Sequence, residues 1–328
     1  MIKKTTLMKS VLFMGCFQSA YSMDIVARFA AAAYQPWREA KAIKEYSEIL
    51  DYGIETGRCQ IASPLVTDYV RTLAGDDEVV VILRPDLAQG AASFPTFSGK
   101  RVMFLDPIYA DKILHDEHYF DASTHQVNIE KYNNALITYQ NETSLIIERM
   151  KLENSDSKQI RIALSAYDKK VEVKEEIDSA ILHESGHNSH KDTLRRFAAC
   201  GIMPIGIISV DYAARKGFSV LFPASGKPSA LRKNIGAGVM AYCYYTSWPY
   251  VKAAIIREQE EQADEVVRQK GEKQTLLGGM LYHAKQDSKF QKIPEAYGDL
   301  RGPLAHHPSD YDRSNRYKQA LENRISIE

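Results

Sequence analysis

The sequence lacks an excess of charge of one sign and has little cysteine, and each of these excludes a class of protein. Lysine plus arginine number 42, and so do aspartate plus glutamate, so no net field favours binding to nucleic acid. The 4 cysteines among 328 residues are too few for a disulfide framework. With 45% apolar and 26% charged residues, the composition is that of a globular protein able to bury a core.

The first residues differ from the rest of the chain. Residues 1–10 carry three lysines and no acid, an apolar run follows at 11–17, and a small-x-small pattern ends at Ser22. This order is typical of a secretory signal peptide, so we predict a signal peptide at 1–22 and export to the periplasm or cell envelope. The alternative is a frayed N-terminal helix. Cleavage would leave three cysteines, which form one disulfide or none: Cys59, Cys200 and Cys243.

An apolar, glycine-bearing stretch covers residues 197–223. Asp211, Arg215 and Lys216 interrupt it, so we predict a buried hairpin rather than a membrane span. The alternative is an integral membrane protein anchored through 197–214, which leaves membrane association open.

The remaining sequence mixes short strand patterns with longer helical ones. Ser63, Pro64 and Gly75 punctuate a helix over 63–75, and a β-branched run follows. This order favours an α+β fold, mostly helical with a small sheet. We predict strands at 78–85 and in a hairpin over 93–107, and helices over 24–55, most of 108–170, 173–190, 254–271 and the region 306–324.

The segment HESGH carries the chemistry. His183 and His187 are four residues apart, so a helix places both imidazoles on one face, where they can hold one metal ion. Glu184 projects beside that ion as general base for a water, which is the HExxH arrangement. The alternative is two ordinary helix histidines. We place His190, three residues on, at the solvated surface.

A hydrolytic zinc site needs a third protein ligand and one open position. Glu260 and Asp264 share a helix face four residues apart. Glu260 can complete the coordination, while Asp264 can accept the free N–H of a ligand histidine and fix its tautomer. Glu261 lies about 100° around the helix and is the weaker candidate.

These motifs together resemble the M48 family of zinc metallopeptidases. HESGH is followed by Arg257, Glu260, Ala263 and Asp264 in an RxxExxAD pattern, and then by His307, Pro308 and Arg313 in HPSDYDR. A looser likeness covers the strand pair around Gly99. The likeness extends over roughly 63–322, and the chain before residue 60 matches nothing in it.

The resemblance implies a gluzincin fold with one Zn²⁺ per chain, bound by His183, His187 and Glu260. It implies a metallopeptidase domain at 63–328 with an insertion at about 108–172. Before this domain, the sequence pattern predicts the signal peptide at 1–22 and a helical extension at 23–62. His307 and Arg313 are expected to assist the transition state. Asp264 is expected to hydrogen-bond a ligand histidine without binding the metal itself. An extended peptide is expected to pair with an edge strand made of Arg101, Val102, Met103, Phe104 and Leu105.

The function expected from residues and resemblance together is a zinc endopeptidase that acts on unfolded or membrane-associated proteins. Its partners are protein or peptide substrates and not nucleic acid. The alternative is a gated or inactive member of the fold that acts as a chaperone or binding module, with the 108–172 insertion over the cleft or His307 in the fourth metal position.

Overall fold

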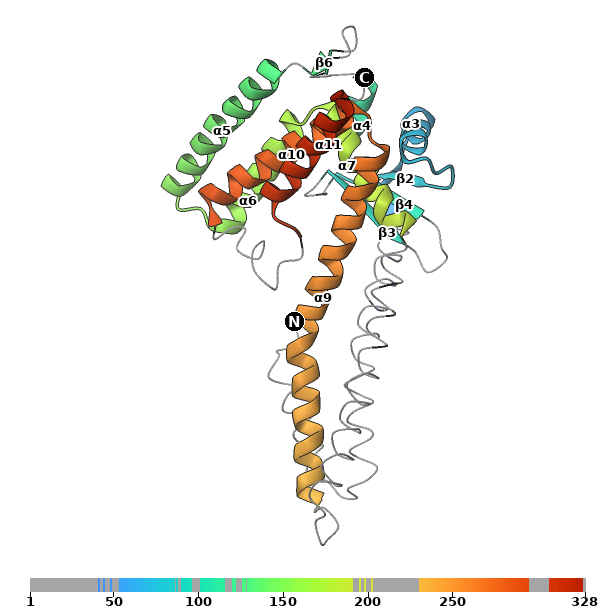
Figure 1. Ribbon diagram of the computed structural model, residues 1–328, viewed down its shortest axis with the longest axis vertical. Coiled ribbons are helices and arrows are strands. Elements are labelled where there is room, and N and C mark those ends of the chain that lie inside the picture. Colours follow the sequence, from blue (N-terminus) through green and yellow to red (C-terminus); the bar gives the residue numbers. More distant parts are fainter. Residues whose placement is uncertain are drawn as a thin grey trace. The chain divides into compact units, whose positions relative to one another are not determined.

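The fold is known from a computed structural model (Figure 1), in which part of the chain is described. The described residues are 53–85, 87, 90–95, 101–115, 120–121, 126–127, 129–190, 230–294 and 307–326, with single positions at 41, 44, 48, 195, 198 and 202. Two compact units are present, one made of Met1–Glu45 with Thr193–Lys252 and one of Tyr46–Asp192 with Ala253–Glu328. The predicted signal peptide, most of the 23–62 extension and nearly all of 197–223 lie outside the described residues. These predictions, and the domain boundary at residue 63, stay predictions.

The second unit contains a four-stranded sheet in the order β1-β2-β4-β3. β2 and β4 pair in parallel, and the other two pairs are antiparallel. The hairpin predicted over 93–107 is confirmed as β3 with β4, and the predicted strand at 78–85 as β2. The strands are β1 (Gln60–Ile61), β2 (Val80–Leu83), β3 (Ala91–Pro95) and β4 (Arg101–Leu105).

The prediction that Arg101–Leu105 forms the edge of the sheet is wrong. β4 is hydrogen-bonded to β2 on one side and to β3 on the other. Its backbone groups are therefore used within the sheet and cannot pair with a peptide. β1 and β3 occupy the two ends of the strand order, and β3 (Ala91–Pro95) is the end strand that packs against α7. The sequence identified the hairpin but could not show which of its strands β2 would join.

The helix α3 (Pro64–Ala74) begins and ends as its sequence predicts. The Ser63 side chain accepts a hydrogen bond from the backbone N–H of Val66, and Gly75 closes the helix with a φ of 64°. Its apolar face packs with the sheet and the central helix α7 (Lys174–Ser189). This core includes Val66, Val70, Val81, Met103, Leu105, Ile177 and Ile181, all buried.

Helices α3, α4 and α10 pack against α7. α10 packs against both α7 and α11, and α5 packs against α10 and α6 (Figure 1). The predicted helical content of the insertion is observed, because α4, α5 and α6 lie within or at the start of 108–172. The bounds are α4 (Pro107–His115), α5 (Ile129–Leu152), α6 (Ser157–Val171), α9 (Ala230–Lys270), α10 (Lys273–Lys292) and α11 (Asp310–Ser326), with a small ribbon of β5 (Phe120–Asp121) and β6 (Gln126–Val127).

Helix α9 is longer than predicted. It ends at Lys270, next to the predicted stop at Gly271, but it begins at Ala230 rather than near residue 254. Pro249 lies inside this span, and a proline normally ends or starts a helix because it lacks the backbone N–H. The proline therefore concealed the first half of the helix in the sequence.

A group of buried charges lies where α6 joins α7, and we call it the junction cluster. The Lys285 ammonium donates to both carboxylate oxygens of Glu176, at 2.8 and 3.0 Å, and Lys289 donates to Asp168. Tyr109 donates its hydroxyl to Glu172. Burial, with the charges of Glu176 and Asp168, raises the pKa of Glu172 to about 7. Four helices therefore meet at charged side chains: α4, α6, α7 and α10.

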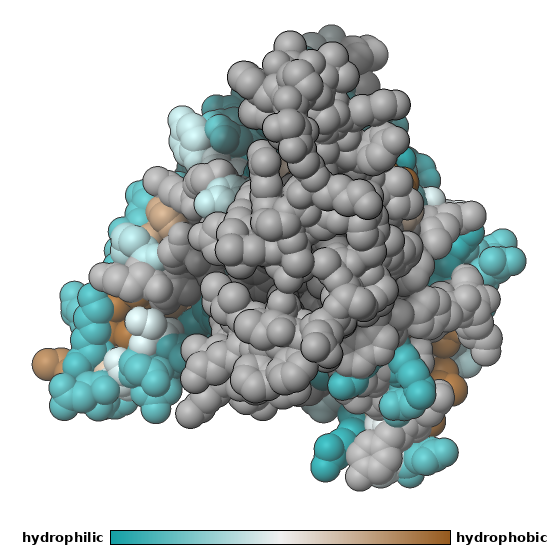
Figure 2. All heavy atoms as spheres, turned by 90° about the horizontal axis from the view of Figure 1, so that it is seen from below, coloured by the Kyte–Doolittle hydropathy of each residue, from teal (hydrophilic) through white to brown (hydrophobic). Residues whose placement is uncertain are grey.

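Among the described residues, no helix combines the length and the apolar content that crossing a membrane requires. In the view of Figure 2 the described surface is mostly hydrophilic, with separate small hydrophobic areas. The exposed large apolar side chains include Leu145 and Leu152 on α5 and Ile162 on α6.

Candidate metal centre

Helix α7 positions the HESGH residues. Its first turn carries Glu175 and Glu176, which suit the positive end of a helix dipole, and its apolar residues Ile177 and Ile181 are fully buried. This anchors one face of the helix in the core. The face bearing His183, Glu184 and His187 remains partly accessible. The prediction of a helix over 173–190 is confirmed.

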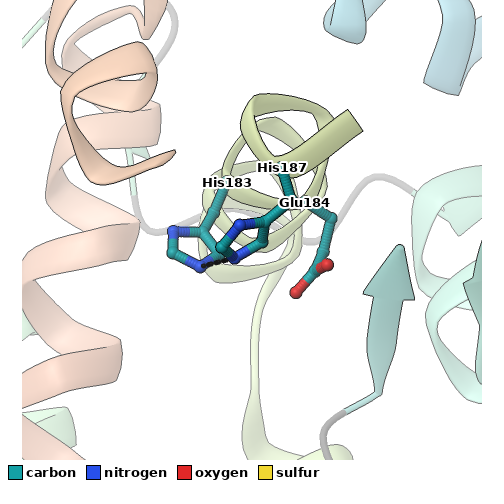
Figure 3. Close-up of side chains that lie close together, drawn as sticks. All are labelled: His183, Glu184 and His187. Atoms are coloured by element: carbon teal, nitrogen blue, oxygen red, sulfur yellow. Dashed lines mark hydrogen bonds between the residues drawn. The ribbon is translucent and has the colours of Figure 1, made fainter. Parts of the chain in front are cut away.

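The two histidines meet as their spacing predicts. Their Nε2 atoms lie 3.2 Å apart, and the rings stand nearly perpendicular with centroids 4.8 Å apart. Figure 3 shows both rings on one side of α7, with the Glu184 carboxylate beside them. His183, Glu184 and His187 each offer a ligand atom within 4.8 Å of the others. Histidine and carboxylate donors at these distances suit a divalent metal ion such as zinc.

Helix α9 brings a further carboxylate to the pair. Glu260 places one oxygen 3.3 Å from His183 Nε2 and the other 3.4 Å from His187 Nε2. Its side chain is only 10% exposed, so this carboxylate is largely buried between the two rings. The predicted third ligand is therefore beside both histidines.

A glycine allows the two ligand-bearing helices to approach. A Cβ added to Gly186 would lie 2.8 Å from the Cα of Ala263, a distance that real side chains do not reach. Gly186 therefore removes the side chain that would separate α7 from α9 where His187 must meet Glu260. A glycine inside a helix costs about 1 kcal/mol relative to alanine, and here the close approach explains its presence.

Asp264 lies one turn after Glu260 and is fully buried. Its Oδ1 lies 2.9 Å from His183 Nδ1. An ionised carboxylate only accepts, so Nδ1 carries the proton and Nε2 is free to face a metal. Burial alone would raise the pKa of Asp264, but the charge of Arg313 and the His183 hydrogen bond hold it well below its usual range. Asp264 therefore stays ionised and fixes the His183 tautomer.

Arg313 is paired with Asp264 behind the two histidines. Its Nε and Nη2 donate to the two oxygens of Asp264, both at 2.7 Å, and its side chain is 8% exposed. This bidentate pair directs the guanidinium at Asp264, while Nη1 lies 3.7 Å from Glu260. Arg313 therefore contacts the acid that lies against His183 Nδ1, and its part in the transition state stays a prediction. The motif predicted its presence at the site but not the direction in which it points.

His307 lies at the open side of the site. Its Nδ1 is 3.0 Å from Glu260 Oε2, and its side chain is 37% exposed. Burial alone would raise the pKa of Glu260, but its histidine neighbours His183, His187 and His307 hold that pKa well below its usual range. Glu260 therefore stays a carboxylate, the form that a metal binds.

Glu184 points to the sheet. Its Oε2 accepts a hydrogen bond of 2.6 Å from the backbone N–H of Ser93 on β3. The two glutamates of the site therefore have different partners. Glu260 lies between the imidazoles, and Glu184 is hydrogen-bonded to strand β3. The donor set fits a zinc ion bound by His183, His187 and Glu260, with Glu184 left to act on a water.

Sequence reasoning missed two contributors. Tyr317 donates its hydroxyl to Asp264 Oδ1 at 3.1 Å, and it lies four residues after Arg313, so helical spacing could have identified it. Ser93 contributes a backbone group, for which the sequence carries no signal. The alternative ligand Glu261 pairs instead with Arg268 and Arg316, away from the histidines.

Comparison with known proteins agrees with this geometry. The family model described as Peptidase family M48 matches residues 158–320, which include α7, α10, most of α11 and the part of α9 that bears Glu260. Searches of the curated proteins and of the solved structures found no match.

Proposed function

This chain belongs to peptidase family M48 through residues 158–320, and from that premise we propose that it is a zinc-dependent endopeptidase of gluzincin fold. The family makes it a metallopeptidase that acts on proteins or peptides. The observation that carries the finer proposal is the division between the two glutamates. Glu260 lies 3.3 and 3.4 Å from the histidine Nε2 atoms, and Glu184 is hydrogen-bonded to β3.

The proposed ligands are His183, His187 and Glu260, one zinc per chain. Zinc held there would supply Lewis-acid chemistry, which acidifies a water and polarises a carbonyl. Asp264, itself held by Arg313 and Tyr317, keeps the His183 ring oriented throughout.

The proposed proton path runs through Glu184. Its carboxylate takes a proton from the attacking water as the new C–O bond forms. It then delivers that proton to the nitrogen of the leaving amine as the C–N bond breaks. His307, on the open side of the site, is the group proposed to donate to the oxyanion that develops on the carbonyl.

Substrate is proposed to pair along β3, the end strand of the sheet that packs against α7. Backbone pairing reads little of a substrate's sequence, which suits an enzyme acting on unfolded or membrane-associated chains. The basic, apolar and small-residue order of residues 1–22 supports export to the periplasm or cell envelope as part of the proposal.

The test is cleavage of an unfolded protein by the wild type beside Glu184→Gln, with zinc measured in both samples. Glutamine keeps the size of the side chain but cannot accept the proton. We expect about one zinc per chain in both proteins and cleavage by the wild type alone. Equal cleavage by both proteins would show that Glu184 is not the general base. If both proteins bind zinc and neither cleaves, the result would favour the alternative function of a binding module.

A further inference from the structure

The backbone of β3 alternates between its two sides. The Gly90 carbonyl accepts from the Asp106 N–H at 2.7 Å, so the even-numbered residues of the strand face β4. Ala91, Ser93 and Pro95 then direct their backbone groups outward. Pro95 fits this pattern, because the N–H that proline lacks is not needed on the outer side.

The outward N–H of Ser93 lies against helix α7, which packs on β3. It donates to Glu184 Oε2 at 2.6 Å. A hydrogen bond to an ionised carboxylate is shorter and about twice as strong as one between neutral groups. It occupies one oxygen of the carboxylate and leaves the other for the reaction.

We propose that the Ser93 backbone N–H is a positioning group that fixes the Glu184 carboxylate beside the ligand histidines. The proposal rests on the proposed function, in which Glu184 is the general base. A glutamate side chain has several rotatable bonds, and a proton acceptor misplaced by about 1 Å can lose roughly a hundredfold in rate. One bond to a rigid strand removes most of that freedom.

This role differs from pairing with the substrate. A peptide that added to β3 in the fully hydrogen-bonded register would also seek the Ser93 N–H. Positioning of the base affects the chemical step and hence kcat, whereas pairing with the peptide affects KM. The two roles therefore give different kinetics when this single donor is removed.

The test is Ser93→Pro, compared with Ser93→Ala. Proline removes the N–H and, because Ser93 faces outward, breaks no hydrogen bond between β3 and β4. Alanine removes the hydroxyl and keeps the N–H. We expect both variants to hold zinc, with similar KM, and kcat of the proline variant to be about tenfold or more below that of the alanine variant.

A raised KM with equal kcat would overturn the proposal in favour of substrate pairing, and unchanged kinetics would overturn it outright. A second measurement decides the case where Ser93→Pro does not fold or the wild type does not cut. Selective ¹⁵N-serine labelling reports the Ser93 amide in the zinc-loaded protein and in Glu184→Ala. A marked upfield shift of that amide proton in Glu184→Ala supports the proposal, and an unmoved amide overturns it. Failure to cut with a shifted amide would count against the proposed function alone.

Discussion

The described residues bury two clusters of charge, and they differ in how their carboxylates are balanced. In the site cluster (His183, Glu260, Asp264 and Arg313), cationic and hydrogen-bonding partners outweigh burial and hold the pKa of both acids well below the usual range. In the junction cluster, burial and neighbouring acids raise the pKa of Glu172 to about 7. Burial is common to both. The partners decide whether an acid stays charged and can serve as ligand or anchor.

The largest expected effect comes from removing the anchor of the site cluster with Asp264→Ala. Arg313 would be left as a buried charge and His183 would lose its acceptor. We expect a loss of about 3–5 kcal/mol in the free energy of unfolding and zinc binding roughly 10- to 100-fold weaker. Urea unfolding and competition with a chromophoric chelator measure the two. Glu261→Gln is the matched control, because Glu261 is 37% exposed and pairs away from the histidines.

Substitutions in the junction cluster should change the stability of the fold and leave the zinc affinity unchanged. Lys289→Met removes the cation from Asp168, which then keeps only the Tyr139 hydroxyl as its described side-chain donor. We expect unfolding to become easier by about 3–5 kcal/mol, while the zinc affinity of the folded protein stays the same. Lys318→Met, whose side chain is 60% exposed, should change stability by less than about 1 kcal/mol. A weaker zinc affinity in Lys289→Met would mean that the two clusters are coupled.

Two glycines sharpen the comparison further. Gly186→Ala would push against Ala263 and separate the helices that carry the ligands. We expect a stability loss of about 1–3 kcal/mol and zinc binding about tenfold weaker. Gly278→Ala is the counterpart on α10, where a Cβ would lie 2.0 Å from the Glu175 carbonyl oxygen. It should destabilise the fold, yet its folded fraction should bind zinc as the wild type does.

The smallest expected effect is a pH dependence from Glu172. Its pKa is raised from 4.5 to about 7, so the folded state binds this proton more tightly than the unfolded state. Stability from this group is therefore present below about pH 4.5 and is lost as the pH rises through about 7. Groups facing Glu172 from the surrounding helices are Tyr109, Asp168, Glu176 and Lys285.

Glu172→Gln should remove that dependence. Between pH 5 and pH 8, we expect the wild type to lose about 1–3 kcal/mol more stability than the glutamine variant. Urea unfolding at several pH values measures the difference. Parallel pH profiles for the two proteins would show that Glu172 does not titrate in this range.

The two clusters also differ in how far the sequence predicts them. The site is made of short motifs, because His183 with His187 and Glu260 with Asp264 are each one helical turn apart. The junction pairs join distant residues: Asp168 and Lys289 are 121 positions apart, and Glu176 and Lys285 are 109 apart. No periodicity connects such residues, so only the packed helices reveal them.

The same difference between local and long-range contacts explains which predictions about the fold were right and which were wrong. Capping residues at Ser63 and Gly75 predicted α3, because those signals act within a few residues. The choice of edge strand depends on β2 joining β4 across the sheet, which is a tertiary event. The direction of the Arg313 guanidinium likewise depends on where α9 places Asp264 relative to α11.

The central claim is that one glutamate holds the metal and the other does the proton transfer. The most direct test is the zinc affinity of Glu260→Gln beside Glu184→Gln, measured by chelator competition. We expect Glu260→Gln to bind zinc roughly a hundredfold or more weakly than the wild type, and Glu184→Gln to bind it as the wild type does. The reverse result, with zinc lost from Glu184→Gln and kept by Glu260→Gln, would contradict the assignment.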